Sequence, residues 1–141
     1  MPLFDHLGLT VESLDRAFAQ WDPVLRALGC ESNGVEMEGG LAWSRDGETE
    51  LILYRAPEPG GEPHRYGTIG WQHLAFAVDS RAEVERLHGI ALDAGWTSVR
   101  DPKPFPRFSE RYYASFVEDD NGIRIEFMVN PPRRAVGGVE A

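Results

Sequence analysis

The chain is nearly free of cysteine and has no long apolar run. Cys30 is its only cysteine, so an intrachain disulfide is impossible and a cysteine-based zinc site is excluded. No stretch approaches the roughly 18 consecutive apolar residues of a membrane-spanning helix. The start, from Met1 to Asp5, lacks the basic segment of a signal peptide. We therefore expect a cytoplasmic protein without a membrane partner.

Basic side chains are also scarce. Lys and Arg number 14 against 23 Asp and Glu, which leaves a net charge of −9. Such a surface repels phosphate backbones and anionic lipid, so nucleic acid is not an expected partner. The composition, 42% hydrophobic and 26% charged, is typical of a globular protein, and 141 residues fit one domain. A small molecule is the expected ligand.

An internal repeat is the most informative feature present. Residues 4–9 read FDHLGL and residues 72–78 read QHLAFAV, and an amphipathic helix pattern and strand-like segments follow each of them. The repeat predicts two similar modules, at about 3–55 and 70–129. Between them, residues 56–69 form a linker rich in proline and glycine, and residues 130–141 form a tail.

Each module is predicted to contain a strand, a helix and three further strands. The first helix runs from Ser13 to Leu28, and Pro23 inside it should kink or divide it. The remaining predicted elements are the strands Leu3–Val11, Cys30–Glu36, Leu41–Arg45, Glu48–Arg55, Gly70–Val78, Trp96–Arg100, Tyr112–Glu118 and Ile123–Val129, a second helix that begins with the capping-box pattern of residues 80–83, and a loop over Asp101–Glu110. The predicted fold class is α+β, with two βαβββ modules whose open sheet faces form a shared cleft.

Three candidate metal ligands point away from the predicted helices. In the strand that opens the second module, alternate apolar residues from Leu74 on should face the helix, which leaves His73 on the open face. The same alternation leaves Glu126 on the open face of the last strand and His6 on that of the first. Two imidazoles and one carboxylate suit Zn²⁺, Mn²⁺, Fe²⁺ or Ni²⁺. The alternative for Glu126 is an ion pair with an arginine: Arg107, Arg111 or Arg124.

An apolar or aromatic ligand is expected to contact further side chains near these three. The expected substrate pocket contains Trp71, Tyr112, Tyr113, Arg124 and Met128. Tyr112 and Tyr113 have opposite parity, so only one of them can face the cleft, and the sequence leaves the choice open. His64 in the linker and His88 on the second helix are both expected to be solvated.

At this point the chain resembles the vicinal oxygen chelate superfamily, which includes glyoxalase I, fosfomycin-resistance thiol transferases, extradiol dioxygenases and bleomycin-resistance proteins. The resemblance covers about residues 3–129 and is strongest in residues 5–9, 73–76 and 116–127. It implies that the first and last strands of each module supply metal ligands, which are His6, His73 and Glu126 here. Counted from the turn glycines, Leu51 matches Glu126 in the first module, and Glu50 is one residue off. A four-ligand site is therefore not expected, and two alternatives stay open: a three-ligand site, as in the fosfomycin-resistance branch, and a degenerate site without metal.

The resemblance also suggests what the protein does. The leading hypothesis is a glyoxalase-like lyase, isomerase or transferase that uses a divalent metal as a Lewis acid, with Glu126 as its catalytic residue. The alternative is a ligand-sequestering binder of the bleomycin-resistance type, and a weaker one is a regulatory module that has lost the site. Superfamily members often form homodimers, in which modules pair within or between chains, so a homodimer is expected.

Overall fold

The computed structural model describes residues 3–58 and 60–131. Its elements, in chain order, are β1 (Leu7–Val11), α1 (Leu14–Ala27), β2 (Gly40–Arg45), β3 (Glu48–Arg55), β4 (Leu74–Ala77), α2 (Arg81–Asp93), β5 (Thr97–Pro104), β6 (Tyr113–Glu118) and β7 (Arg124–Val129). Apart from residues 130 and 131, the predicted tail lies outside the described residues. Neither described helix is long and apolar enough to cross a membrane.

Helix α1 has the limits that the sequence predicts, but it is not divided. Ser13 caps its first turn by accepting a hydrogen bond from the backbone N–H of Arg16 at 3.3 Å, and Gly29 follows its end with φ +88°. Pro23 lies inside a single continuous helix. The proline removes only one helical hydrogen bond, and burial of Trp21, Val24 and Leu25 around it holds the helix together.

The predicted strand Cys30–Glu36 is wrong. Apart from one bridge between Glu31 and Ser44, this segment is irregular. Its backbone bonds locally, because the side chains of Ser32 and Asn33 accept from the N–H groups of Gly34 and Val35 at 3.1 and 2.9 Å. Those hydrogen bonds compete with strand pairing, so the first module has three strands.

The two modules have sheets of matching topology. In the first sheet, of order β1-β3-β2, β1 runs parallel to β3; in the second, of order β4-β7-β6-β5, β4 runs parallel to β7. Strand β5 is longer than predicted and ends at Pro104, so the following loop begins later. Its prolines are tolerated because β5 is an edge strand, where the missing N–H groups are not needed for pairing.

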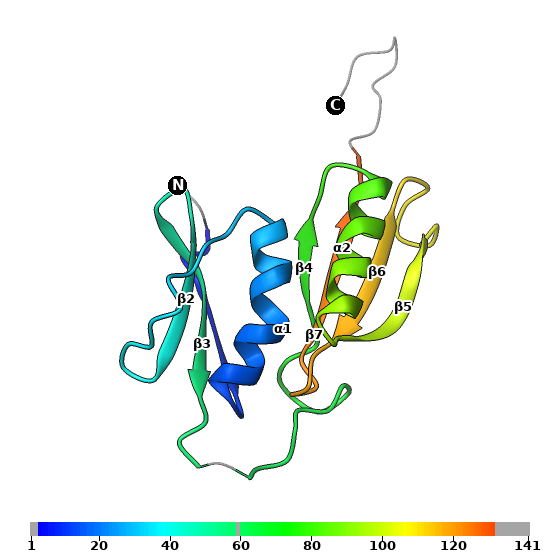
Figure 1. Ribbon diagram of the computed structural model, residues 1–141. Coiled ribbons are helices and arrows are strands. Elements are labelled where there is room, and N and C mark those ends of the chain that lie inside the picture. Colours follow the sequence, from blue (N-terminus) through cyan, green and yellow to red (C-terminus); the bar gives the residue numbers. More distant parts are fainter. Residues whose placement is uncertain (1–2, 59, 132–141) are drawn as a thin grey trace.

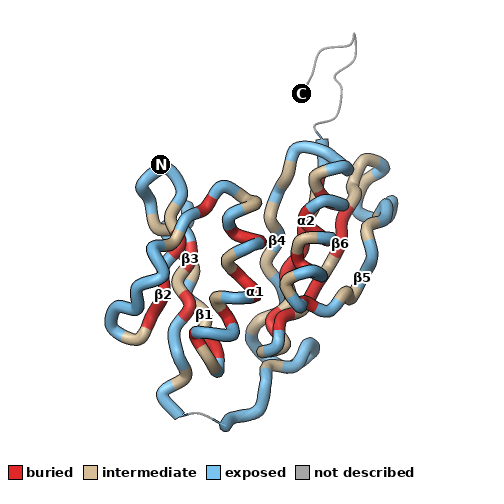
Figure 2. Tube along the Cα trace, viewed as in Figure 1, coloured by how far each residue is buried: buried red, intermediate tan, exposed pale blue. Residues whose placement is uncertain are grey.

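The two modules share one hydrophobic core. Figure 1 shows α1 between the three-stranded sheet and the second module, where it also contacts α2. The rings of Trp21 on α1 and Trp96 before β5 meet edge to face at 4.8 Å. In Figure 2 the buried residues lie on the strands and on the helix faces that pack together, whereas the segment from β3 to β4 is largely exposed.

Alternation along the strands gives each sheet a face away from its helix. In β4, Leu74 and Phe76 are partly buried and Ala75 and Ala77 are exposed, and in β7 Ile125 and Phe127 belong to the core. The α+β fold class and the glyoxalase-like arrangement of two modules predicted from the sequence are therefore confirmed.

Candidate functional site

His73, Glu126 and Tyr112 are in contact on the open face of the second sheet. Nε2 of His73, just before β4, lies 3.0 Å from Oε1 of Glu126 on β7. The hydroxyl of Tyr112, just before β6, donates to Oε2 of the same carboxylate at 2.5 Å. Parallel pairing of Ala75 with Glu126 brings the start of β4 beside this carboxylate. The alternation that predicted His73 and Glu126 on one face thus has the expected geometric result.

Glu126 is almost completely buried, with 2% of its surface exposed. A buried carboxylate needs compensating partners, and here they are an imidazole and a phenol, not an arginine. Arg124 pairs with Glu118 at 2.6 Å, and Arg111 donates to the backbone oxygen of Pro131. Burial, and then the hydrogen bond to Glu126, raise the pKa of Tyr112 well above its ordinary value, so its phenol stays protonated and keeps donating.

Both ring nitrogens of His73 face oxygen atoms. Nδ1 contacts the side-chain oxygen of Gln72, whose amide nitrogen is directed to the hydroxyl of Tyr66 at 3.0 Å. A neutral imidazole has only one N–H. When Nδ1 donates to Gln72, Nε2 presents a lone pair toward the Glu126 carboxylate. Metal-binding histidines have this arrangement, with the outer N–H held by an acceptor and the inner nitrogen free to bind.

His6 lies apart from this group. It precedes β1, its side chain is 47% exposed, and its Nδ1 contacts Oδ1 of Asp5 at 2.6 Å. His6 and His73 both line one cavity of about 470 Å³ between the modules, which we call the junction cavity. Among residues 3–58 and 60–131, no three His, Cys, Asp or Glu side chains form a group that could hold a metal. The single chain therefore brings two of the three predicted ligands together.

Strand register corrects the expected match to Glu126 in the first module. Glu126 pairs with Ala75, and the equivalent pair in the first sheet is Gly8 with Ile52, so Ile52 and not Leu51 holds the corresponding position. Glu50 is the extra residue of a bulge, since Ser44 pairs with Thr49 and Trp43 with Leu51. An isoleucine cannot bind a metal, which keeps the number of candidate ligands at three.

The predicted substrate-pocket residues have different surroundings. Tyr112 faces the site, whereas the ring of Tyr113 lies under the guanidinium of Arg81 on α2. Of the two tyrosines, Tyr112 is therefore the one that faces Glu126. The indole N–H of Trp71 donates to the backbone oxygen of Arg124 at 3.1 Å. Trp71 also lines the junction cavity. Met128 is partly buried on the face that carries Glu126.

A second cavity borders His73, and the sequence did not predict it. This aromatic cleft, about 510 Å³, is lined among others by Phe105, Phe108 and Phe116, with Arg100 and Lys103 beside them. Most of these residues lie on β5 or in the segment Asp101–Glu110 that the sequence predicts as a loop. The run of aromatic and basic residues from Arg100 to Phe108 was the available signal.

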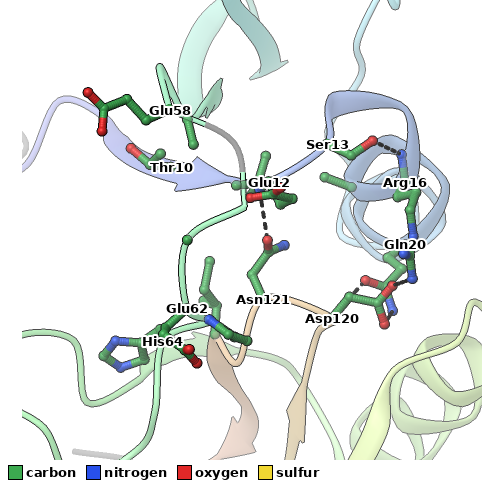
Figure 3. A pocket seen from close by; sticks show the side chains of 16 residues that line it. Thr10, Glu12, Ser13, Arg16, Gln20, Glu58, Glu62, His64, Asp120 and Asn121 are labelled. Carbon is green, nitrogen blue, oxygen red and sulfur yellow. Dashed lines mark hydrogen bonds and ion pairs between the residues drawn. The ribbon is translucent and has the colours of Figure 1, made fainter.

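A third cavity, of about 460 Å³, lies at the linker and is shown in Figure 3. Its polar groups largely bond to one another: Asn121 accepts from the N–H of Glu12 at 2.9 Å, Arg16 pairs with Asp120, and Gln20 accepts from the N–H of Asp120 at 3.0 Å. These hydrogen bonds join the first module to the β6–β7 turn.

The comparisons with known proteins agree with the topology. Residues 3–127 match the model of the Glyoxalase/Bleomycin resistance protein/Dioxygenase superfamily. The chain is 29% identical over 125 residues to the uncharacterized protein YqjT of Bacillus subtilis (strain 168), a match that covers 87% of this chain and 95% of YqjT. Because the superfamily model matches residues 3–127, nearly the whole chain, the protein belongs to this superfamily.

Solved structures have the same fold. A candidate glyoxalase from Bacillus halodurans is 28% identical with a TM-score of 0.75, and the match covers 91% of this chain and 96% of that one. A glyoxylase/bleomycin resistance protein/dioxygenase domain from Frankia sp. EAN1pec has a TM-score of 0.74 at 18% identity, with 98% and 97% covered. The second likeness concerns the fold alone.

Proposed function

We propose that the protein is a glyoxalase-like enzyme in which His73 and Glu126 bind a divalent metal. The observation that carries this proposal is the buried Glu126 carboxylate, 3.0 Å from a ring nitrogen whose opposite nitrogen is held by Gln72. An imidazole and a carboxylate suit Zn²⁺, Mn²⁺, Fe²⁺ or Ni²⁺. When bound, the metal would supply Lewis-acid polarisation of adjacent substrate oxygens, as a lyase, isomerase or transferase requires.

Glu126 is the proposed catalytic residue. Tyr112 holds Oε2, so Oε1 is the one oxygen left to act. When it is not bound to the metal, Oε1 could accept a proton from a substrate carbon, while the C–H electron pair forms a C=C bond and the π pair of the adjacent carbonyl moves to its oxygen. Tyr112 would orient the carboxylate throughout.

The third proposed ligand is His6 of a second copy of the chain. His6 occupies in the first module the place of His73 in the second, yet it joins no three-donor group in the described part of one chain. The open face of the first sheet is unpaired, with Tyr54 39% exposed and Met37 nearby 71% exposed. A homodimer that exchanges modules would cover this face and bring His6 toward His73 and Glu126.

Metal analysis of protein purified without chelators tests the metal. We expect stoichiometric metal in the unmodified protein and its loss in the His73→Ala and Glu126→Gln variants. Glu50→Gln is the matched control, because Glu50 lines the junction cavity but is not a proposed ligand. Metal-free protein that also fails to take up added Zn²⁺, Mn²⁺, Fe²⁺ or Ni²⁺ would contradict the proposal.

Sedimentation tests the dimer separately. The unmodified chain should sediment as a dimer at micromolar concentration. An equimolar mixture of His6→Ala and His73→Ala chains should recover metal in about a quarter of its sites, because about half of the dimers are mixed and each mixed dimer rebuilds one of its two sites. A monomer, or no recovery on mixing, would rule out exchange.

A ligand-sequestering binder is the second candidate. It is supported by Tyr112, which already donates a hydrogen bond to one oxygen of Glu126, and by His73, whose Nε2 lies 3.0 Å from the other oxygen and could donate to it without a metal. The two cavities that border His73 would then hold the ligand. This candidate predicts tight ligand binding that is unchanged by chelators.

A further inference from the structure

The aromatic cleft is basic, although the protein as a whole carries a net charge of −9. Its lining contains Arg100, Lys103, Arg107 and Arg124 and no Asp or Glu. Arg124 is occupied by Glu118 at 2.6 Å and by the ring of Tyr66. The other three form no ion pair with any carboxylate of residues 3–58 and 60–131. Their charge is therefore available to a ligand.

Strand register aligns one of these cations with the proposed site. Arg100 on β5 pairs with Phe116 on β6, and Phe116 pairs with Glu126 on β7. Neighbouring strands lie about 4.8 Å apart, so Arg100 is two strands, or about 10 Å, from Glu126 on the same face. Lys103 lies in the next row, opposite Ala114, which in turn pairs with Met128.

Aromatic rings fill the space between the cations and His73. The ring centroid of Phe105 is 5.9 Å from that of Phe108 and 5.8 Å from that of Phe116. The Phe116 ring meets the His73 ring edge to face, with 5.4 Å between the centroids. Phe108 is 55% exposed, so its ring is accessible to a ligand. The rings form one wall from the mouth of the cleft to His73.

Two cations lie directly on this wall. The ammonium of Lys103 is 5.1 Å from the centre of the Phe105 ring, and the guanidinium of Arg107 is 5.1 Å from that of Phe108. A ring with a charged group would match both features at once, because its plane can stack on phenylalanine while its anion meets the cations. Guanidinium groups bind carboxylates in a two-pronged geometry.

We propose that the ligand of this cleft is an aromatic carboxylate, with its ring against Phe105 and Phe116 and its anion at Arg100 and Lys103. The inference rests on the proposed function in that it names the substrate class of the same face. The local charge of the cleft is opposite to the net charge of the protein, so the proposed ligand is an anion.

Three probes that share a ring and differ in charge test this proposal: naphthalene-2-carboxylate, its neutral carboxamide, and 2-naphthylmethylamine. Calorimetry on the full chain should show the carboxylate binding about five- to tenfold more tightly than the carboxamide, and the amine most weakly. The Arg100→Gln/Lys103→Gln double variant should lose that preference while its carboxamide affinity stays unchanged. Arg26→Gln, which removes one positive charge from α1, should change nothing.

Repeating the titrations with a chelator and with Glu126→Gln separates this proposal from the metal proposal. A preference for the carboxylate that survives both treatments supports the anion site. If the unmodified protein also contains no metal, the metal site is rejected while the anion site stands. Metal-bound protein that binds carboxylate and carboxamide equally rejects the anion site alone. Phe105→Ala should weaken all three probes alike, and a loss confined to the carboxylate would contradict the stacking role of this ring.

Discussion

Glu126 depends on Tyr112 more than on any other hydrogen-bond donor. Only 2% of the surface of Glu126 is exposed, so water cannot replace a lost partner. The Tyr112→Phe variant should lower the free energy of unfolding by about 1–3 kcal/mol, because Oε2 is left without its donor. Urea denaturation followed by circular dichroism measures this loss.

Tyr113→Phe is the control for that experiment. It removes the same atom from the neighbouring residue, where Arg81 lies over the ring at 4.7 Å and a phenylalanine ring would serve equally. A loss for Tyr113→Phe as large as that for Tyr112→Phe would show that Glu126 does not need its phenol.

His88 is buried, contrary to the expectation that it is solvated. Its Nε2 is 3.1 Å from the hydroxyl of Ser98. Its Nδ1 has no partner in the described parts of the chain. Burial lowers the pKa of His88 below its usual value, and the nearby carboxylate of Asp101 opposes this only partly. The folded protein therefore favours the neutral imidazole.

Stability should consequently fall on the acid side. The unfolded chain binds a proton on His88 near its ordinary pKa of about 6.5, whereas the folded chain binds it only at lower pH. The stability that depends on a neutral His88 is fully present above about pH 6.5 and is lost as the pH falls below that value. Urea midpoints measured from neutral to mildly acidic pH should show the decline, and His88→Leu should flatten it. An unchanged slope would assign the decline to other groups.

At the scale of elements, the two hairpin turns differ in what surrounds their glycines. Gly47 and Gly122 both have positive φ, +82° and +77°. A Cβ on Gly47 would meet nothing within 4 Å, whereas one on Gly122 would lie 1.8 Å from the backbone oxygen of His64. The backbone of the segment that leads into β4 therefore packs directly against the β6–β7 turn.

Alanine substitutions at Gly47 and Gly122 should separate two costs: backbone strain at positive φ, which both share, and a steric clash with His64, which only Gly122 has. Gly47→Ala should cost about 1–2 kcal/mol, the ordinary penalty of a left-handed residue. Gly122→Ala should cost about 1–3 kcal/mol more, because rigid backbone must move. Thermal unfolding of the pair measures the difference, and equal losses would mean that the His64 segment yields freely.

At the scale of the whole molecule, two indoles join the modules. Trp21 on α1 donates to Asp119 at 2.9 Å, and Trp96 donates to the backbone oxygen of Gln20 at 2.8 Å. Both rings belong to one core that contains residues of both modules. We therefore expect a single unfolding transition, with coincident fluorescence and circular dichroism curves at a fixed protein concentration.

Trp21→Phe should weaken this coupling. It removes a hydrogen bond between modules and should lower stability by about 1–3 kcal/mol and broaden the transition. Trp43→Phe removes a bond of similar length, 3.0 Å to Asp22, but inside the first module. It should lower stability without broadening. Two transitions in the unmodified protein would contradict the shared core.

The sequence by itself was enough to predict both helices, the faces of the strands and all strands except the wrongly predicted Cys30–Glu36 and the longer extent of β5. Alternation with period two depends only on neighbouring residues, so His73 and Glu126 could be assigned to one face without knowing the partner strands. The capping residues Ser13 and Ser80 likewise marked helix starts through local hydrogen bonds.

Only the tertiary structure decided which side chains from different elements meet. Register places Ile52, not Leu51, opposite Gly8, and places Arg100 in line with Phe116 and Glu126. Burial of His88 and the packing of α1 between the modules depend on long-range contacts that no local pattern records. The separation of His6 from Glu126 also depends on long-range contacts, because the packing of the two modules sets it and neither strand does so alone.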